Sequence, residues 1–302
     1  MKILIIGGLG FIGTNLFKEL KKRNYQITIL DNYTIKNNLK FIKCKIIKNN
    51  LSDINKLKKI FINYDVILNL ASQTGVIESL NKPIYSVKNN IITYANILES
   101  LKTSKCKVFM NASTAGAIYG NTSKISNEKS PTLPVSIYGL TKKFNEDYSK
   151  ILSKNLKCRI IHLRFSNVFG PYSIHKKSLI HNSIIRALSN DVISIFGNGK
   201  QVRNFIFVED LTKIIIKLFK AKSGTYNISS PKSNSINHYL KILNNINPNI
   251  KIKKRKFNDG EVKEVYVSNL KVMKELKLKK FHFTKFEDAI KKTFDWYQKN
   301  LN

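Results

Sequence analysis

The sequence predicts an α/β protein with a doubly wound parallel sheet, followed by a smaller α/β lobe. The first half of the 302-residue chain alternates short apolar runs with helical patterns, which is typical of βαβ units. The alternation weakens from about residue 167. We therefore expect a first domain over residues 1–166 and a lobe over residues 167–302, whose elements can cross back to the first domain. No apolar run approaches the roughly 18–20 residues that span a bilayer.

Six short apolar runs predict the strands of the sheet. Each is four to seven residues long and rich in Ile, Val and Leu, as expected for parallel strands that are buried on both faces. In chain order we expect strands at Lys2–Ile6, Gln26–Leu30, Cys44–Ile47, Val66–Leu70, Lys107–Asn111 and Arg159–Phe165.

Helical periodicity fills the intervals between these strands, with apolar residues recurring every three to four positions. In the first half we expect helices at Phe11–Arg23, Ile54–Phe61, Val87–Leu101 and Tyr138–Leu152. In the lobe we expect helices at Ser178–Ser189, Val208–Lys220, Ile236–Leu243 and Lys285–Lys299, mixed with short strands.

Charge and cysteine content narrow the classes of function. The formal net charge is +34, yet only six of the 53 basic residues are Arg, the residue that reads nucleic acids by bidentate contacts. We interpret the scattered Lys as a solvated coat and expect no specific nucleic-acid partner, with polyanion binding or attraction of anionic substrates as alternatives. Cys44, Cys106 and Cys158 form no CxxC pair, which argues against disulfides and zinc. With an N-terminal apolar stretch too short for a signal peptide, we expect a cytoplasmic protein without metal or membrane insertion.

A glycine-rich turn between the first strand and the first helix predicts a dinucleotide site. Gly7, Gly8, Gly10 and Gly13 satisfy both GxGxxG and GxxGxxG, and glycines let the backbone approach a pyrophosphate at a helix N-terminus. Asp31 ends the second strand 18 residues after Gly13. A carboxylate there can bind a ribose diol and would repel a 2′-phosphate, so the motif favours NAD over NADP.

Two other strand ends fit the same cofactor. Asp53 follows the third strand and could meet the adenine amino group, although an N-cap of the next helix is an equal alternative. Leu70 and Ala71 end the fourth strand, where small residues could line the path of the cofactor or simply permit close contact between elements.

A YxxxK motif suggests the chemistry. Tyr138 and Lys142 lie four residues apart on a predicted helix and therefore face the same side. A neighbouring ammonium favours the phenolate and would lower the pKa of the tyrosine. Ser113 and Thr114 end the fifth strand, where a hydroxyl could bind the same substrate oxygen as Tyr138.

In this order and spacing, the motifs resemble an extended short-chain dehydrogenase/reductase. The segment LRFSNVFGP at 163–171 is similar to the LRxxNVYGP segment of that family, and IFGNGKQVRNFIFVED at 195–210 is similar to its IxGdGxQxRDFxxVxD segment. The resemblance implies an NAD-binding Rossmann domain and a lobe for a nucleotide sugar. It also implies a set of dinucleotide contacts: Gly7, Gly10, Phe11, Ile12, Gly13, Asp31, Asn32, Asp53, Leu70, Ala71, Tyr138 and Lys142.

Within this family the chain looks most like the nucleotide-sugar 4-epimerases, of which UDP-glucose 4-epimerase is typical. Dehydratases and decarboxylases of the family carry an acidic residue just after the catalytic hydroxyl, whereas this chain has Ala-Gly-Ala at 115–117. The resemblance therefore implies transient oxidation of C4 to a 4-keto sugar by Tyr138, Lys142, Thr114 and Ser113. It further implies that the substrate, a UDP-sugar, contacts Thr114, Asn167, Phe196, Arg203 and Arg255.

Departures and alternatives remain. Asn258 stands where the family often has a second phosphate-binding Arg, so Arg255 or Lys256 would have to substitute. The position that gates N-acetyl sugars in such epimerases falls near Val265, or at Tyr266 if the alignment shifts by one residue. The rival functions are an NAD(P)H-dependent reductase of a keto-sugar nucleotide and a non-catalytic member that binds RNA or a partner protein. The resemblance also suggests a homodimer formed through the helices at 87–101 and 138–152.

Overall fold

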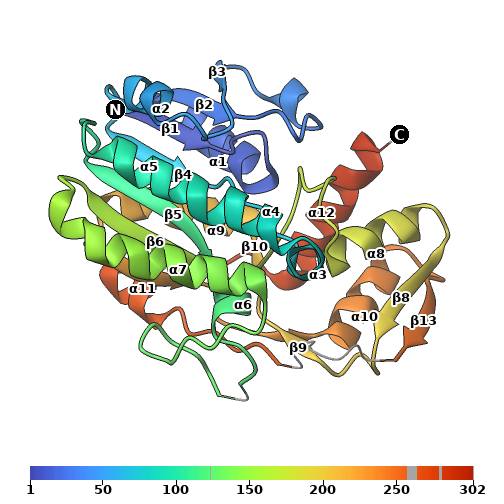
Figure 1. The fold of residues 1–302 in the computed structure, drawn as a ribbon. Coiled ribbons are helices and arrows are strands. Elements are labelled where there is room, and N and C mark those ends of the chain that lie inside the picture. Colours follow the sequence, from blue (N-terminus) through green and yellow to red (C-terminus); the bar gives the residue numbers. More distant parts are fainter. Residues whose placement is uncertain (123, 257–263, 279–280, 302) are drawn as a thin grey trace.

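The central element of the computed structural model is a seven-stranded parallel sheet, seen in Figure 1. The structure describes residues 1–122, 124–256, 264–278 and 281–301. The strand order is β11-β6-β5-β4-β1-β2-β3, which confirms the doubly wound fold. The bounds are β1 Lys2–Ile6, β2 Gln26–Asp31, β3 Lys45–Lys48, β4 Val66–Asn69, β5 Val108–Thr114, β6 Arg159–Phe165 and β11 Gly224–Ile228.

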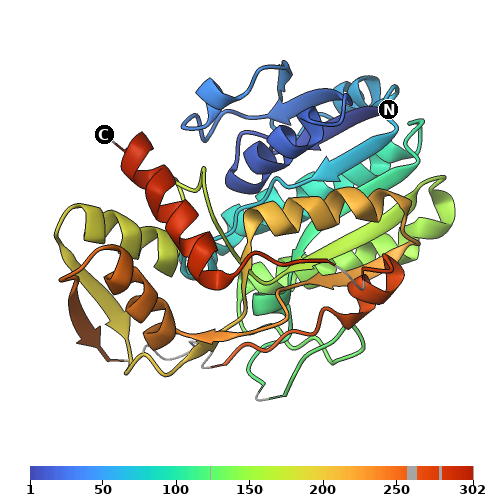
Figure 2. The ribbon, with the colours of Figure 1, turned by 180° about the vertical axis from the view of Figure 1, so that it is seen from behind.

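The sheet is covered on both faces because its strands are apolar on both sides. In β1, Ile3 and Ile5 face one core, whereas Leu4 and Ile6 face the other, and all four are fully buried. The first core is closed by α1 (Phe11–Lys21) and α9 (Val208–Lys217), and the second by α2 (Ile54–Phe61), α5 (Thr93–Leu101) and α7 (Ile137–Leu152). Figures 1 and 2 show these two layers from opposite sides.

The helix expected at Val87–Leu101 starts earlier and is not regular. It begins as α4 (Pro83–Val87), widens into a π-helical turn at Lys88–Ile92 and continues as α5. A short helix, α3 (Val76–Asn81), precedes it and was not predicted. Asn90 lies in this wider turn, and its side chain is buried.

The lobe is built from helices and three two-stranded sheets around its own core. The sheets pair β7 (Asn167–Phe169) with β10 (Phe205–Phe207), β9 (Val202–Arg203) with β12 (Asn234–Ser235), and β8 (Val192–Phe196) with β13 (Lys251–Arg255). The helices are α8 (Leu179–Leu188), α10 (Ile236–Ile246) and α12 (Phe286–Asn300). Short helices α6 (Ala115–Ile118) and α11 (Leu270–Glu275) complete the described elements, with single 3₁₀ turns at 39–41, 153–155 and 218–220.

The second half of the chain contributes to both layers. Strand β11 pairs in parallel with β6 at one edge of the large sheet, and α9 lies against α1 beneath it. The chain reverses its winding direction between β1 and β4, so the carboxyl ends of these two strands open a crevice. Ligands of doubly wound folds bind at this reversal, and the lobe stands beside it (Figure 1).

Candidate active site

The glycine turn is needed because two strand ends meet there. Gly7 has a φ of +75°, and a Cβ on it would lie 2.7 Å from the backbone nitrogen of Ala71. A Cβ on Gly13 would lie 2.6 Å from the carbonyl oxygen of Gly7. Gly10 is the N-cap of α1 and has no side chain that could cap the helix. The first backbone N–H groups of the helix can therefore bind a ligand. This cradle fits the pyrophosphate of a dinucleotide.

Asp31 lies against the glycine turn, as the motif predicts. Its carboxylate accepts hydrogen bonds from the backbone N–H of Leu9 at 3.0 Å and of Tyr33 at 2.9 Å. Burial raises the pKa of Asp31, and these two hydrogen bonds oppose the rise. The neighbouring Asn32 is exposed, and its side chain accepts from the backbone N–H and the hydroxyl of Thr34. The backbone around the glycine turn thus holds the Asp31 carboxylate in place, next to where a ribose would bind.

The other predicted cofactor contacts occupy two different settings. Asp53 caps α2 by accepting from the backbone N–H of Lys56 at 3.0 Å, which is the capping alternative. Leu70 and Ala71 are half-buried at the end of β4, beside Gly7. They therefore lie at the crevice, whereas Asp53 lies at the start of a surface helix.

Tyr138 and Lys142 share one face of α7, close to the end of β5. Ser136 caps the helix by accepting from the N–H of Gly139 at 3.1 Å. A Cβ on Gly139 would lie 2.3 Å from the carbonyl oxygen of Ala117, so only glycine lets α7 start this close to α6. The Lys142 ammonium donates to the carbonyl oxygen of Ala112 at 2.9 Å and lies 5.8 Å from the centre of the Tyr138 ring.

The protein groups alone do not lower the pKa of Tyr138 as the motif predicts. Burial raises it to about 12, and the hydrogen bond with Thr114 only partly opposes this. Burial also lowers the pKa of Lys142 to about 8, opposed by the negative charge of Glu146. Desolvation therefore disfavours both charges before any ligand is considered.

Only one of the two predicted hydroxyls faces Tyr138. The hydroxyl of Thr114 lies close enough to the Tyr138 phenol to lower the pKa of Tyr138, and it accepts from the backbone N–H of Ala117 at 3.2 Å. Ser113 instead donates to the Glu146 carboxylate at 2.5 Å. Alternation along β5 accounts for the difference, because successive side chains point to opposite faces.

Glu146 and Arg164 form a buried ion pair that the sequence analysis missed. The guanidinium reaches the carboxylate through Nε at 3.0 Å and Nη2 at 2.6 Å, and both side chains are less than a tenth exposed. Arg164 also donates to the hydroxyl of Tyr119 at 2.8 Å. The available signal was the spacing of Glu146, four residues after Lys142 on the buried stripe of the helix.

Asn90 is a second residue that the sequence analysis missed. From the π-helical turn, its amide donates to the carbonyl oxygen of Gln73 at 3.0 Å and to the hydroxyl of Thr141 at 3.1 Å. Its oxygen accepts from the N–H of Gln73 at 2.8 Å and from the hydroxyl of Ser72 at 2.9 Å. Asn90 thus joins the loop after β4 to α7, next to Lys142.

Apart from Thr114 at the end of β5, the predicted substrate residues lie on four short strands of the lobe. Asn167 begins β7, and its side-chain oxygen would lie 3.6 Å from a Cβ on Gly116 in α6. Phe196 and Arg255 are register partners across β8 and β13, so they are neighbours. Arg203 lies on β9, half-buried. The segment with Asn258 lies outside the described residues.

Val265 is brought against α6, although it lies far away in the sequence. Its backbone N–H donates to the carbonyl oxygen of Val202 at 3.1 Å, and its side chain packs with Ala115, Ile118 and Tyr119. Among the described residues, a small cavity beside α6 is lined by both Gly116 and Val265. The segment around Val265 thus lies next to the turn that carries Thr114.

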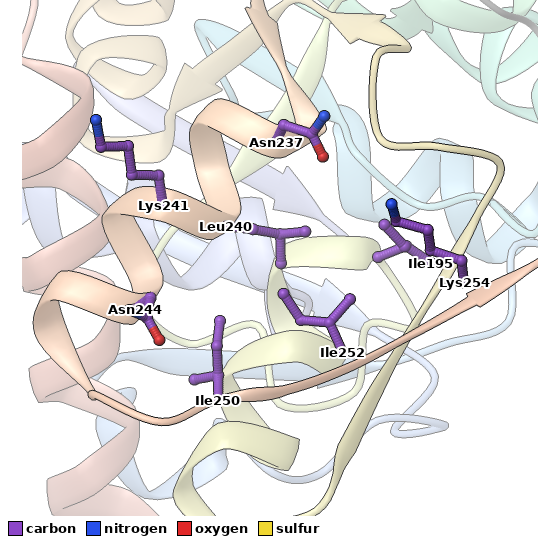
Figure 3. Close-up of a pocket in the computed structure, with 8 residues that line it drawn as sticks. All are labelled: Ile195, Asn237, Leu240, Lys241, Asn244, Ile250, Ile252 and Lys254. Carbon is purple, nitrogen blue, oxygen red and sulfur yellow. The ribbon is translucent and has the colours of Figure 1, made fainter.

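A larger cavity, of about 270 Å³, opens elsewhere on the lobe between α10, β8 and β13 (Figure 3). Four apolar side chains, Ile195, Leu240, Ile250 and Ile252, meet there, with two Lys and two Asn at the rim. Because Ile195 precedes Phe196 on β8, their side chains point to opposite faces of the strand. This cavity therefore lies away from the predicted substrate residues.

No helix within the described ranges is long and apolar enough to cross a membrane.

Comparisons with known proteins agree with this arrangement. Residues 3–229 match the "NAD dependent epimerase/dehydratase family". A "Putative UDP-glucose 4-epimerase" of Methanocaldococcus jannaschii is 33% identical over 247 residues, covering 80% of this chain and 81% of the relative.

Two solved structures cover the whole chain and are themselves wholly covered by it. One is UDP-glucose 4-epimerase of Thermotoga maritima with UDP-glucose, at a TM-score of 0.93 and 24% identity, which supports the fold alone. The other is UDP-glucuronic acid 4-epimerase of Bacillus cereus with UDP-glucuronic acid and NAD, at a TM-score of 0.90 and 27% identity.

Proposed function

Because the chain belongs to the NAD dependent epimerase/dehydratase family, we propose that it is an NAD-dependent 4-epimerase of a nucleotide-activated hexose. The family and its relatives act in nucleotide-sugar metabolism, with NAD as cofactor. The glycine cradle, Asp31 and the Tyr138–Lys142 pair are the groups of this chain that would hold NAD.

The observation that carries the proposal is the composition of the turn after Thr114. Helix α6 consists of Ala115, Gly116, Ala117 and Ile118 and therefore offers no acid or base beside the phenol. The nearby carboxylate of Glu146 is held by Arg164 and Ser113. Elimination needs a further acid–base group, whereas inversion at C4 needs only a proton carrier for one oxygen.

The residues of the chain have distinct tasks in such a reaction. When bound, NAD supplies a reversible hydride acceptor at a sugar carbon. Thr114 and Tyr138 bind the O4 hydroxyl, and Tyr138 takes its proton and later returns it. Lys142, fixed on the Ala112 carbonyl, holds the ribose and adds positive charge near the phenol. Since burial raises the pKa of Tyr138 to about 12, the phenolate depends on that charge and on the charge of the oxidised cofactor.

The substrate class proposed is a UDP-sugar. Phe196 would contact the uracil, and Arg203 and Arg255 would pair with the diphosphate, since planar guanidinium groups bind phosphate bidentately. Asn167 would contact the diphosphate from β7. Val265 lies beside α6, and its small side chain would leave more room for an N-acetyl group than a larger residue there.

The test is direct observation of C4 inversion. Purified protein is incubated with NAD⁺ and, separately, UDP-glucose, UDP-N-acetylglucosamine and UDP-glucuronic acid, and each mixture is followed by NMR. The proposal expects one of these sugars to equilibrate with its C4 epimer without net formation of NADH. Stoichiometric oxidation of NADH with a keto-sugar, and no epimer, would instead identify the reductase.

We also propose that the protein is a homodimer through α4, α5 and α7. Helices α3, α4 and α7 and the π-helical turn before α5 expose a set of large apolar side chains that is unusual for a monomer surface: Ile77, Leu80, Ile84, Tyr85, Ile92, Leu140 and Phe144. A second copy would cover them. Light scattering should give a dimer mass for the protein and a monomer mass for Ile84→Asp, and a monomeric parent protein would contradict the proposal.

The three free cysteines fit a cytoplasmic location.

A further inference from the structure

A segment of the lobe crosses the dinucleotide end of the sheet. This segment, Gly170–Lys176, is called the strap. At its start, the carbonyl oxygen of Pro171 accepts from the side-chain amide of Asn15 on α1 at 2.9 Å. The carbonyl oxygen of Tyr172 accepts from the amide of the buried Asn38 at 2.9 Å. The strap is therefore bound to the helix that begins at the glycine turn.

The other end of the strap reaches the opposite side of the crevice. The ammonium of Lys176 donates to the hydroxyl of Thr74, in the loop after β4, at 3.3 Å. Between the two ends, Ser173 donates to the carbonyl oxygen of Gly170 at 2.7 Å and hydrogen-bonds with the Tyr297 hydroxyl at 2.7 Å. Figures 1 and 2 both show the segment after β7 passing beside α12. The strap thus spans the crevice and places the ammonium of Lys176 on its far side.

The positive charge of Lys176 acts electrostatically on Lys142. Burial lowers the pKa of Lys176, and the charge of Lys176 is one cause of the lowered pKa of Lys142. Within the described ranges, no carboxylate lies within 4.0 Å of either ammonium. Glu146 is paired with Arg164. Two partly desolvated like charges that share a crevice are unfavourable unless an anion lies with them.

We propose that Lys176, held at the far end of the strap, binds an anionic group of the nucleotide ligand that fills this crevice. The inference rests on the proposed function, because it takes the crevice to be the nucleotide site. Two sources share the required chemistry of negatively charged oxygens: the diphosphate of the dinucleotide, and the C6 carboxylate of a uronic-acid sugar. A neutral hexose offers no such group at C6, so the two sources are separable.

The experiment compares Lys176→Gln with Lys177→Gln, the exposed neighbour that serves as the matched control. Calorimetry measures the Kd for NAD⁺, and the C4-inversion assay measures KM for UDP-glucose and UDP-glucuronic acid. A charge-assisted hydrogen bond corresponds to about ten- to hundredfold in affinity. We expect that loss in Kd for NAD⁺ if the diphosphate is the partner. We expect it only in KM for UDP-glucuronic acid if the carboxylate is the partner.

Lys176→Arg, which keeps the positive charge, should recover most of the lost affinity, and added salt should weaken ligand binding more for the parent protein than for Lys176→Gln. Values for Lys176→Gln that match Lys177→Gln in all three titrations would overturn the inference. Binding of NAD⁺ is measured without turnover, so a loss there supports the role of Lys176 even if no sugar is inverted at C4. Conversely, if Lys176→Gln inverts C4 with an unchanged Kd for NAD⁺ and unchanged KM values, the proposed function stands and Lys176 does not bind the ligand.

Discussion

Replacing Glu146 by Gln isolates the buried ion pair beneath the active site. Gln keeps the shape of the side chain and removes its charge. Arg164 then remains less than a tenth exposed with a neutral partner. The hydrogen bond from Ser113 also loses its charged acceptor, and Ser113 directly precedes Thr114.

The expected cost follows from burial. Removing one partner of a buried ion pair leaves the other charge uncompensated, which typically costs about 3–5 kcal/mol. Native domains are stable by about 5–15 kcal/mol, so the variant should lose a large part of its free energy of unfolding. The exposed pair of Glu99 and Lys102, with a contact of 2.6 Å, provides the control. Glu99→Gln should cost only about 0–1 kcal/mol.

Urea denaturation followed by circular dichroism measures both costs. The double variant Glu146→Gln, Arg164→Met should recover part of the loss, since it removes the unpaired charge. A loss for Glu146→Gln no greater than that for Glu99→Gln would refute the claim that Glu146 compensates the buried charge of Arg164. Because the negative charge of Glu146 raises the pKa of Lys142, the variant should also lose activity at a lower pH than the parent protein.

Five further results are expected. Tyr138→Phe should retain NAD⁺ in a binding titration but lose turnover about 10²–10⁴-fold in the NMR assay, since it removes the proton carrier; full activity would exclude that role. Gly13→Ala should lose NAD⁺ binding or unfold at lower temperature, because its Cβ would lie 2.6 Å from a carbonyl oxygen; parent-like binding and melting would contradict this. Asp53→Ala should cost about 0.5–2 kcal/mol in urea denaturation and leave the Kd for NAD⁺ unchanged, as expected of a helix cap, and a weaker Kd would restore its adenine role. Activity should fall as pH rises above about 8, where Lys142 loses its charge; an unchanged rate at pH 9.5 would remove the need for that charge. The free energy of unfolding should instead rise between pH 8 and pH 10.5. In that range Lys142 keeps its proton in the unfolded chain but loses it in the folded protein.

The elements were predictable where burial follows a simple period. The bounds of β1, β6 and α2 agree with the sequence prediction, and most other predicted strands and first-half helices differ by one to three residues. Continuous apolar runs can be buried only between two covering layers, so the fold class followed. The π-helical turn at Lys88–Ile92 has no comparable signal, because its buried Asn90 contacts Gln73 and Thr141, which lie elsewhere in the sequence.

At the candidate site, the sequence determined some features and the tertiary structure determined others. The sequence by itself determined the glycine turn, the acidic end of β2 and the pairing of Tyr138 with Lys142, because each depends on residues a few positions apart along one strand or helix. Only the tertiary structure decided which hydroxyl faces Tyr138, that Glu146 pairs with Arg164, and that Lys176 reaches Thr74 from another part of the chain. Such contacts join residues up to about a hundred positions apart, and their energies depend on burial, which no local pattern contains.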